Sequence, residues 1–287
     1  MRLSLKTRIL NVFRAAFKVP TLERALADMT ANGSPRSLVA KLVPNPYQYA
    51  KPSWRKINKD GIILHVDISD YLGHYYYFGF VDTSHDALEQ LCLPGMVVLD
   101  VGTNLGYTAL RLAKKVADGS VVGFEPDPQN FTLCQKNLAA NNFRNLQVHN
   151  VGLGASRKTA IMETRVSFNR GGNRINENVA DGQRIEVHML DEYFPSLGVP
   201  RVDLMKIDVE GYELQVLRGA ERIISEYRPR LFVEVDDSNL KDQGDSAELL
   251  IEFLRKLGYK ISDAETGIAV ESGRDLINKH IDIIAVP

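Results

Sequence analysis

Glycine and acidic residues suited to binding a cofactor follow a short apolar segment in the first half of the chain. The segment Val97–Gly106 reads VVLDVGTNLG. It predicts a buried strand that ends in Asp100. A tight turn with Gly102, Asn104 and Gly106 then opens a helix, and such a turn at the carboxyl edge of a parallel sheet lets the backbone approach a ligand. The glycine spacing differs from the Gly-x-Gly-x-x-Gly pattern of dinucleotide-binding proteins, which disfavours a nicotinamide-dependent reductase.

A second acidic residue follows at a spacing typical of a nucleoside site. Residues 121–126 read VVGFEP, and Glu125 lies 19 residues after Gly106. A carboxylate that ends the second strand can accept hydrogen bonds from both hydroxyls of a ribose. The simpler alternative is an ordinary exposed acid. With Pro126 beside it and Gly152 after the following strand, Glu125 completes the predicted cofactor site.

Three further carboxylates end two later strands. Residues 203–213 read DLMKIDVEGYE, so Asp208 and Glu210 follow a buried strand, and Glu234 ends the next one. We expect Asp208, Glu210 and Glu234 to be catalytic, and Asp208 also to contact the cofactor. They could serve as a general base, a cofactor anchor or ligands of a divalent cation, and the sequence leaves the metal question open. In the simpler interpretation Asp208 caps the following turn and Glu210 pairs with Lys206.

Strands and helices alternate from residue 96 to the C-terminus. This alternation predicts an α/β fold with a mostly parallel, seven-stranded sheet and helices on both faces. Asp127 is a plausible N-cap of a helix that begins at Pro128. The expected strands are 96–101, 120–124, 145–151, 202–207, 231–235, 258–262 and 280–286, and the expected helices are 105–116, 128–141, 212–225 and 247–257.

One stretch interrupts this alternation. Residues 158–166 and 184–190 resemble strands, and residues 167–182 between them are rich in glycine and asparagine. The intervening stretch is either an excursion over the sheet edge that carries specificity or a solvent-exposed loop. An aromatic-rich segment earlier in the chain holds His74, a further candidate base whose simpler role is structural.

The N-terminal part of the chain differs in charge from the rest. Residues 1–60 hold twelve Lys and Arg against three Asp and Glu, a net charge of +9; the remaining 227 residues hold 23 and 33, a net charge of −10. Residues 7–19 have a helical period of apolar side chains, and residues 31–56 form a Pro-punctuated connector. The helix could bind a membrane surface, bind a partner, act as an organelle presequence, or pack on its own domain. We therefore divide the chain into an extension, 1–60, and a domain, 61–287.

Composition and missing motifs exclude several classes. Hydrophobic residues make up 44% and charged residues 25% of the 287 residues, as in ordinary globular proteins, and no apolar run is long enough for a membrane span. Two cysteines, Cys92 and Cys134, predict free thiols and a reducing, cytoplasmic compartment. No Asn/Asp-Pro-Pro-Tyr/Phe motif is present, neither cysteine follows a proline, and the acidic body lacks a basic footprint, so we expect no nucleic-acid substrate.

Several of these segments occur together in one combination. They are Asp100–Gly106 (DVGTNLG), Phe124–Pro128 (FEPDP) with Asn137 and Asn141 behind it, Leu190-Asp191, Asp203–Gly211 (DLMKIDVEG) and Leu217–Ala220 (LRGA). The combination resembles the FkbM family of methyltransferases, most strongly over residues 80–240. Thr103 stands where the family usually has alanine. The resemblance implies a class I methyltransferase (Rossmann-like) fold, S-adenosylmethionine as methyl donor, and usually O-methylation of acceptors such as sugars and polyketide hydroxyls.

These observations together predict an S-adenosylmethionine-dependent methyltransferase that methylates a hydroxyl of a sugar or another small-molecule acceptor. The alternative is a catalytically silent cofactor-binding module that acts through its basic N-terminal helix. Intact Gly102, Gly106, Glu125 and Asp208 argue against that alternative. A cytoplasmic protein with peripheral membrane contact through residues 7–19 fits the charge pattern, and the oligomeric state is left open.

Overall fold

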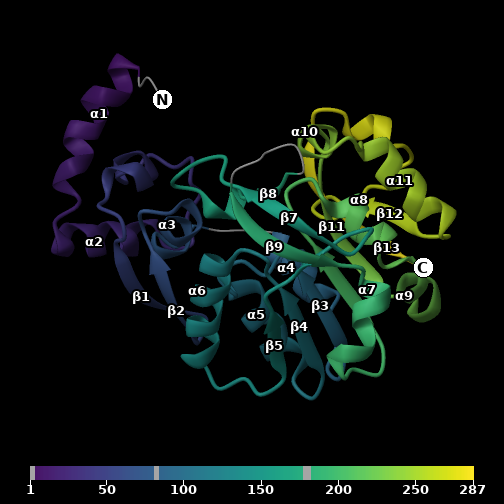
Figure 1. Ribbon diagram of the computed structural model, residues 1–287. Coiled ribbons are helices and arrows are strands. Elements are labelled where there is room, and N and C mark those ends of the chain that lie inside the picture. The colour runs from purple at the N-terminus through teal and green to yellow at the C-terminus, as the bar shows by residue number, and fades with distance from the viewer. Residues whose placement is uncertain (1–3, 81–83, 177–181) are drawn as a thin grey trace. The chain divides into compact units, whose positions relative to one another are not determined.

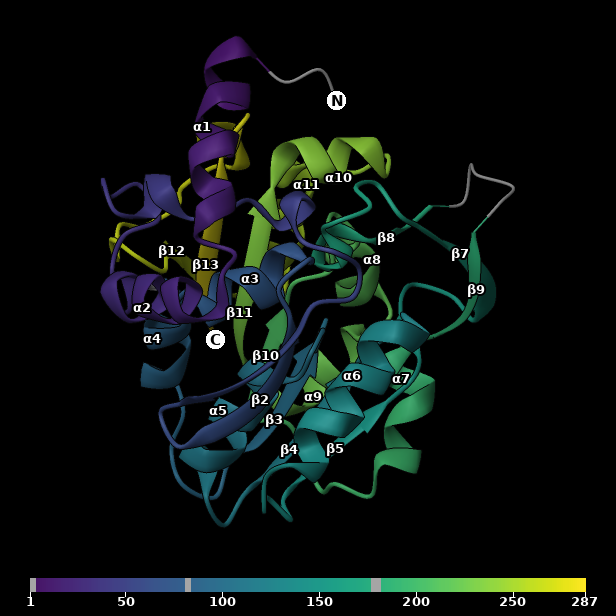
Figure 2. The ribbon, with the colours of Figure 1, turned by 90° about the vertical axis from the view of Figure 1, so that its left-hand side faces the viewer.

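Contacts along the chain separate two units. The computed structural model describes residues 4–80, 84–176 and 182–287. The first unit comprises residues 1–82 and 166–171, and the second comprises residues 83–165 and 172–287. Figures 1 and 2 label the helices and strands of both units. The division by contacts thus differs from the boundary at residue 60, which rests on charge and motifs and stays a prediction.

The first unit combines helices with a β-hairpin. Its core contains Leu26, Val43, Phe78 and Phe80. Buried Glu23 accepts hydrogen bonds from Nε and Nη2 of Arg55 at 2.7 and 3.1 Å, which joins α2 to the hairpin. Its helices are α1 (Leu5–Ala16), α2 (Pro20–Thr30), η1 (Ala40–Leu42), η2 (Pro46–Gln48) and α3 (Tyr71–Tyr77), and its antiparallel strands are β1 (Trp54–Lys59) and β2 (Ile62–Asp67).

The predicted seven-stranded sheet forms the centre of the second unit and is confirmed. The strand order is β12-β13-β11-β10-β3-β4-β5. Only β13 runs antiparallel to its neighbours. The strands are β3 (Val97–Val101), β4 (Ser120–Phe124), β5 (Leu146–His149), β10 (Leu204–Ile207), β11 (Arg230–Asp236), β12 (Lys260–Asp263) and β13 (His280–Val286).

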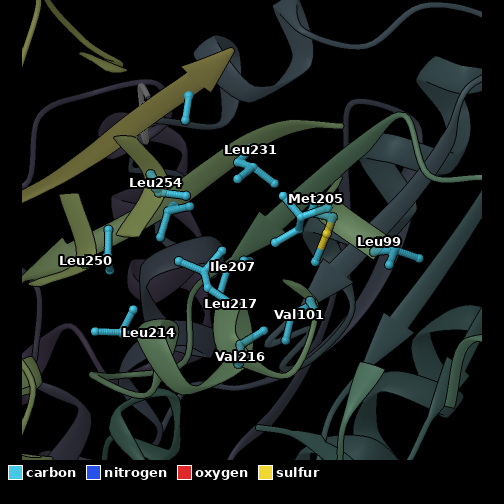
Figure 3. Packing of buried hydrophobic residues seen from close by; sticks show 14 of the residues in the cluster. Leu99, Val101, Met205, Ile207, Leu214, Val216, Leu217, Leu231, Leu250 and Leu254 are labelled. Atoms are coloured by element: carbon cyan, nitrogen blue, oxygen red, sulfur yellow. The ribbon is translucent and has the colours of Figure 1, made fainter. Parts of the chain in front are cut away.

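Both faces of this sheet are buried, and successive side chains of the central strands point to opposite faces. On one face Leu99 and Met205 belong to a cluster that includes side chains of the helices that follow β10 and β11 (Figure 3). On the other face Val98 and Leu204 pack with the helix that follows β3. Because both faces are covered, the central strands β3, β4 and β10 are mostly apolar. The helices of this unit are α4 (Ser84–Gln90), α5 (Tyr107–Val116), α6 (Pro128–Ala139), α7 (Leu190–Tyr193), η4 (Phe194–Leu197), α8 (Glu213–Arg218), α9 (Glu221–Tyr227), α10 (Asp237–Asp242), α11 (Ala247–Lys256) and η5 (Gly273–Leu276).

A second, smaller sheet accounts for the stretch that interrupts the alternation. Its order is β6-β9-β7-β8, with β6 (Gly152–Leu153), β7 (Lys158–Glu163), β8 (Arg174–Ile175) and β9 (Gln183–His188). The predicted loop 167–182 contains η3 (Arg170–Gly172) and β8, and its residues 177–181 lie outside the described residues.

Residues 166–171 of this stretch bind the first unit. The backbone N–H of Tyr71 donates to the carbonyl oxygen of Phe168 at 2.7 Å, and the backbone N–H of Arg170 donates to Oδ2 of Asp70 at 2.9 Å. The Arg170 guanidinium also lies 3.7 Å from Oδ2 of Asp67. The ring of Phe168 meets that of Tyr47 edge to face. This short segment is thus part of the first unit, although the chain on both sides of it belongs to the second.

Two local expectations were wrong. The connector 31–56 ends inside β1, because the residues from Trp54 onward pair with β2. Between α1 and this connector lies α2, a helix that the sequence interpretation did not include and that has Pro20 at its first position. The single helix expected over 212–225 is broken into α8 and α9 at Gly219 and Ala220. A Cβ on Gly219 would lie 2.0 Å from the carbonyl oxygen of Gly154, so close packing against that backbone sets the break.

Candidate cofactor and active site

The predicted site residues follow four neighbouring parallel strands. In the register of the sheet Lys206 on β10 lies between Asp100 on β3 and Phe232 on β11, and Asp100 lies beside Gly123 on β4. Because these strands end at one edge, Gly102, Glu125, Asp208 and Glu234 emerge at that edge together. The sheet therefore brings together the residues that the sequence predicts as one site.

The glycine turn is shaped by the protein's own packing. Gly102 and Gly106 have φ angles of +88° and +91°, which favour glycine. A Cβ on Gly102 would lie 1.8 Å from the backbone oxygen of Asp208, and one on Gly106 would lie 2.8 Å from Sγ of Cys134. These two glycines therefore allow β3 to approach β10 and α6 closely, in addition to any approach of a ligand. The buried side chain of Asn137 supports the same turn by donating from Nδ2 to the carbonyl oxygen of Leu105 at 2.8 Å.

Glu125 is buried where the ends of β3 and β4 meet. Its Oε2 accepts a hydrogen bond from the backbone N–H of Asn104 at 2.7 Å, and its Oε1 accepts one from the N–H of Asp127 at 2.9 Å. Burial raises the pKa of Glu125 to about 7 against these two hydrogen bonds. A carboxylate has about four acceptor positions, so two remain for a diol. The predicted pairing of Glu125 with a ribose fits this geometry.

Two more predicted cofactor residues, Pro126 after β4 and Gly152 at the start of β6, lie close to Glu125. Nδ2 of Asn150 donates to the carbonyl oxygens of Glu125 and Pro126 at 2.8 and 3.1 Å. A Cβ on buried Gly152 would be in ordinary contact with Pro126, 3.6 Å from its Cβ. Asp127 caps α6 as predicted, by accepting from the backbone N–H groups of Gln129 and Asn130. Pro126 and Gly152 therefore lie beside each other, close to Glu125.

A buried lysine connects two acids of the central strands, Asp100 inside β3 and Asp208 directly after β10. Nζ of Lys206 lies 3.1 Å from Oδ2 of Asp208 and 3.5 Å from Oδ1 of Asp100, and it donates to the carbonyl oxygen of Gly102 at 3.0 Å. Burial lowers the pKa of Lys206, but the two carboxylates raise it above its usual value overall. Asp100 is completely buried, whereas 42% of the Asp208 side chain is exposed. Asp208 is therefore the carboxylate of this group that a ligand can reach.

The tight turn after Asp208 depends on a glutamate that the sequence interpretation did not include. Oε1 of Glu213 accepts hydrogen bonds from the N–H groups of Val209 and Gly211 at 3.1 and 2.9 Å. Glu210 in this turn has a left-handed φ of +56°. Nδ2 of Asn239 donates to Oε2 of Glu210 at 3.1 Å, so the suggested pairing of Glu210 with Lys206 is replaced by an amide contact. Burial, aided by the charge of Asp208, raises the pKa of Glu210 to about 7.

Glu234 lies inside β11, two residues before its last residue Asp236, and its side chain is beside His280 of the antiparallel strand β13. Its Oε1 lies 3.4 Å from Nε2 of His280, whose Nδ1 lies 3.2 Å from Oδ2 of Asp236. Burial raises the pKa of Glu234 well above its usual value, and the charge of Asp208 adds to the effect. Glu234 thus stands next to Asp208 in a group of acids that share one edge.

Two other expectations about this chemistry concern a metal and His74. Within residues 4–80, 84–176 and 182–287, no group of three or more His, Cys, Asp or Glu side chains is arranged to hold a metal ion. The structure therefore does not support a bound cation at the strand ends.

Nε2 of buried His74 lies 2.7 Å from the carbonyl oxygen of Pro44, and burial lowers the pKa of His74 to about 4, so this ring is engaged inside the first unit.

Sequence reasoning missed Lys206 as a partner of Asp208, and it missed Glu213 and Asn150 as supports of the loops. The sequence did offer a signal for Lys206, because it lies within an apolar strand and a buried cation requires an anionic partner. Glu213 follows a strand, a turn and a glycine, and only three-dimensional structure shows that its carboxylate turns back to the loop. Asn150 carries no sequence signal, because an asparagine after a strand is ordinary.

The strand order, the single antiparallel strand and the glycine turn with its paired acid define the fold of class I methyltransferases. The chain belongs to the FkbM methyltransferase family, since the family model described as Methyltransferase FkbM domain matches residues 100–261, more than half of the chain. The predicted family resemblance and fold class are therefore confirmed.

Individual relatives are distant, and the chain matches only part of the length of each. The chain is 25% identical over 161 residues to the 2-O-methyltransferase NoeI of Sinorhizobium fredii, covering 51% of this chain and 66% of NoeI. It is 28% identical over 156 residues to the hexuronic acid methyltransferase AglP of Haloferax volcanii, covering 54% of this chain and 62% of AglP. A crystal structure of methyltransferase FkbM from Methylobacillus flagellatus has a TM-score of 0.43 and 22% identity, covering 67% of this chain and 43% of that one. Across the curated relatives that match, the chain covers 13–66% of their lengths.

Proposed function

We propose that this protein transfers a methyl group from S-adenosylmethionine to a hydroxyl oxygen of a sugar or another small-molecule acceptor. Family membership supports methyl transfer. The observation that carries the cofactor is Glu125, a buried carboxylate at the end of β4 with acceptor positions left for a ribose diol. The relatives named for 2-O-methylation and for hexuronic acid methylation support an oxygen nucleophile on a sugar.

The cofactor would lie across the ends of β3 and β4. Glu125 would accept hydrogen bonds from the ribose hydroxyls, and the turn of Gly102, Asn104 and Gly106 would face the rest of the cofactor. Pro126 and Gly152 lie beside each other and would line the part of the site that holds the nucleoside. When bound, S-adenosylmethionine supplies an electrophilic methyl group on a sulfonium.

The acceptor would lie at the ends of β10 and β11. An aliphatic hydroxyl is a poor nucleophile until its proton is removed, so a base must stand within hydrogen-bonding reach. Asp208 is the reachable carboxylate, and Lys206 holds it in one orientation. Glu210, whose pKa is raised to about 7, can receive or share the proton near neutral pH. The pKa of Glu234 is also raised well above its usual value, by burial and by the charge of Asp208, so this group favours its protonated form. We assign the role of base to Asp208 and supporting roles to Glu210 and Glu234.

Calorimetry with S-adenosylhomocysteine tests the cofactor site. The wild type should bind it, and Glu125→Gln should weaken binding by about ten- to a hundredfold, because one charge-assisted acceptor is lost. Glu192→Gln, at an exposed position in α7, is the matched control and should bind like the wild type. Equal affinity of a folded Glu125→Gln variant would remove the assignment, as would tighter binding of NADH than of S-adenosylhomocysteine.

Transfer itself is tested with S-adenosylmethionine that carries a labelled methyl group. A panel of hexoses, uronic acids and small polyols, read by mass spectrometry, should show label on at least one acceptor oxygen. Cofactor binding without transfer to any member of a broad panel would instead favour the silent binding module.

A further inference from the structure

We infer that helix α1 is a docking surface for an anionic lipid membrane. The inference does not depend on the proposed methyl transfer. It rests on the orientation of the helix within the first unit, which is opposite to that of an ordinary surface helix.

The polar side of α1 is bound to the first unit. Nδ2 of Asn11 donates to the hydroxyl of Tyr47 at 3.1 Å, and Nε of Arg14 donates to the carbonyl oxygen of Lys41 at 2.8 Å. Nε2 of Gln48 donates to the carbonyl oxygen of Asn11 at 3.1 Å. These hydrogen bonds fix the rotation of the helix about its own axis. In Figures 1 and 2, α1 stands at a steep angle to α2 and is not laid along it.

The apolar side of α1 faces away from these contacts. No residue of the helix is buried. Leu5, Ile9, Val12 and Phe13 are 72%, 54%, 73% and 65% exposed. An ordinary surface helix turns such a stripe toward its own core. This stripe runs about 12 Å along a helix whose opposite side is hydrogen-bonded to the rest of the first unit, so it requires an apolar environment outside the protein.

The charges around the stripe identify that environment. At 100° per residue, Lys6 and Arg8 lie about 80° on either side of the centre of the stripe. Both are exposed, and α1 contains no acidic residue. Lysine and arginine at the two borders of an apolar face can extend to lipid headgroups while the apolar side chains enter the acyl boundary. The net charge of +9 on residues 1–60 adds attraction to anionic lipid.

A second copy of the chain fits this surface less well. A symmetric dimer through α1 would place the same face of one copy against that of the other. Each border would then bring Lys6 or Arg8 toward further cations, with no acidic residue in the helix to pair with them. A lipid surface supplies both the apolar layer and the negative charge that the helix lacks.

Sedimentation of the full-length protein with vesicles tests the proposal. The protein should bind vesicles of phosphatidylglycerol and phosphatidylcholine, and bind pure phosphatidylcholine vesicles much less. Ile9→Gln/Phe13→Gln should weaken binding by about tenfold or more, because two apolar side chains no longer enter the lipid. Leu249→Gln/Ile268→Gln, at positions that are 44% and 68% exposed in the second unit, is the matched control and should bind like the wild type.

Charge is tested separately. Lys6→Gln/Arg8→Gln should lose most of the preference for phosphatidylglycerol, and raising the salt from about 0.1 M to about 1 M should weaken the wild type in the same way. Lys256→Gln/Lys260→Gln, at exposed positions of the second unit, should change neither property.

Three results would overturn the proposal. The first is equal binding of the wild type and Ile9→Gln/Phe13→Gln to anionic vesicles, or no binding by either. The second is a lipid-free dimer in sedimentation equilibrium that Ile9→Gln/Phe13→Gln converts to monomer, which would assign the face to a second copy. The third is a clear fall in melting temperature in that variant, which would show that the stripe is buried within the protein itself.

Discussion

At the scale of single residues, Asp208 and Lys206 form the chemical centre of the candidate site. Lys206 contacts the buried carboxylate of Asp100 and the half-exposed carboxylate of Asp208. A buried cation with two anionic partners satisfies one carboxylate inside the protein and orients the other toward the ligand. In the function proposed above, Lys206 therefore stabilises the buried Asp100 and positions Asp208 as the base.

The variant Asp208→Asn separates these roles. It keeps the shape of the side chain but cannot accept a proton, so we expect turnover on a true acceptor to fall by roughly 10²–10⁴. The affinity for S-adenosylhomocysteine should change much less, because Glu125 and the glycine turn remain. Steady-state kinetics and calorimetry on the same preparation check both values. Glu210→Gln, which keeps the contact with Asn239, should lose less turnover, and near-normal turnover of Asp208→Asn would transfer the role of base to Glu234.

At the scale of elements, two short family motifs that are distant in sequence meet at the break between α8 and α9. The backbone N–H of Asp191 donates to the carbonyl oxygen of Gly219 at 2.9 Å. The Asp191 carboxylate in turn accepts from the N–H groups of Arg222 and Ile223, both at 2.9 Å, and so caps the start of α9. Leu190-Asp191 and the Leu217–Ala220 segment therefore act as one joint, with a structural role.

Removal of this cap tests the joint. Asp191→Ala should lower the free energy of unfolding by about 1–2 kcal/mol, since two N–H groups at a helix start lose their acceptor. Urea unfolding followed by circular dichroism measures the change, and binding of S-adenosylhomocysteine should stay normal. Glu226→Ala, on the same helix and paired only at the surface with Arg222, is the control and should cost less. A loss for Asp191→Ala no larger than that of the control contradicts the capping role.

The elements also show what the sequence could and could not predict. Strand β4 was predicted at its observed bounds, because a buried parallel strand is a continuous apolar run between turn residues. The antiparallel strand β13 was also predicted at its observed bounds. The acids at strand ends were predicted together because the topology of a parallel sheet gathers them. The small strand β1 was missed because its residues alternate between exposed and half-buried and are mostly polar. The partners of Lys206 and Glu213 were missed because they depend on side-chain direction, which spacing along the chain does not specify.

At the scale of the whole molecule, several buried glutamates make stability depend on pH. Burial raises the pKa values of Glu125 and Glu213 to about 7, from 4.5. A carboxyl group whose pKa is higher in the folded state than in the unfolded state favours folding when it is protonated. Its contribution is fully present below pH 4.5 and is lost as the pH rises through about 7. The protein without a ligand should therefore lose stability between mildly acidic and mildly alkaline pH.

Glu213→Gln isolates one of these groups. Its Oε2 accepts no hydrogen bond within the described part of the chain, so an amide there removes a buried charge while Oε1 can still serve the turn. Relative to the wild type, the variant should gain on the order of 1–3 kcal/mol between about pH 5 and about pH 8. Thermal melts across this range measure the difference. For Glu221→Gln, at an exposed position, the melting temperature should change with pH as it does in the wild type. The same pH dependence in Glu213→Gln as in the wild type would refute the burial argument.

The short segment 166–171 has a consequence for how such proteins can recombine. It lies inside the matched family domain, 100–261, yet it packs with the first unit through Phe168 and Arg170. An exchange of the N-terminal unit between two relatives would leave that segment facing foreign versions of Tyr47, Asp67 and Asp70. A working chimera must therefore carry both pieces from the same parent, so that two stretches separated by more than eighty residues are inherited as a single module.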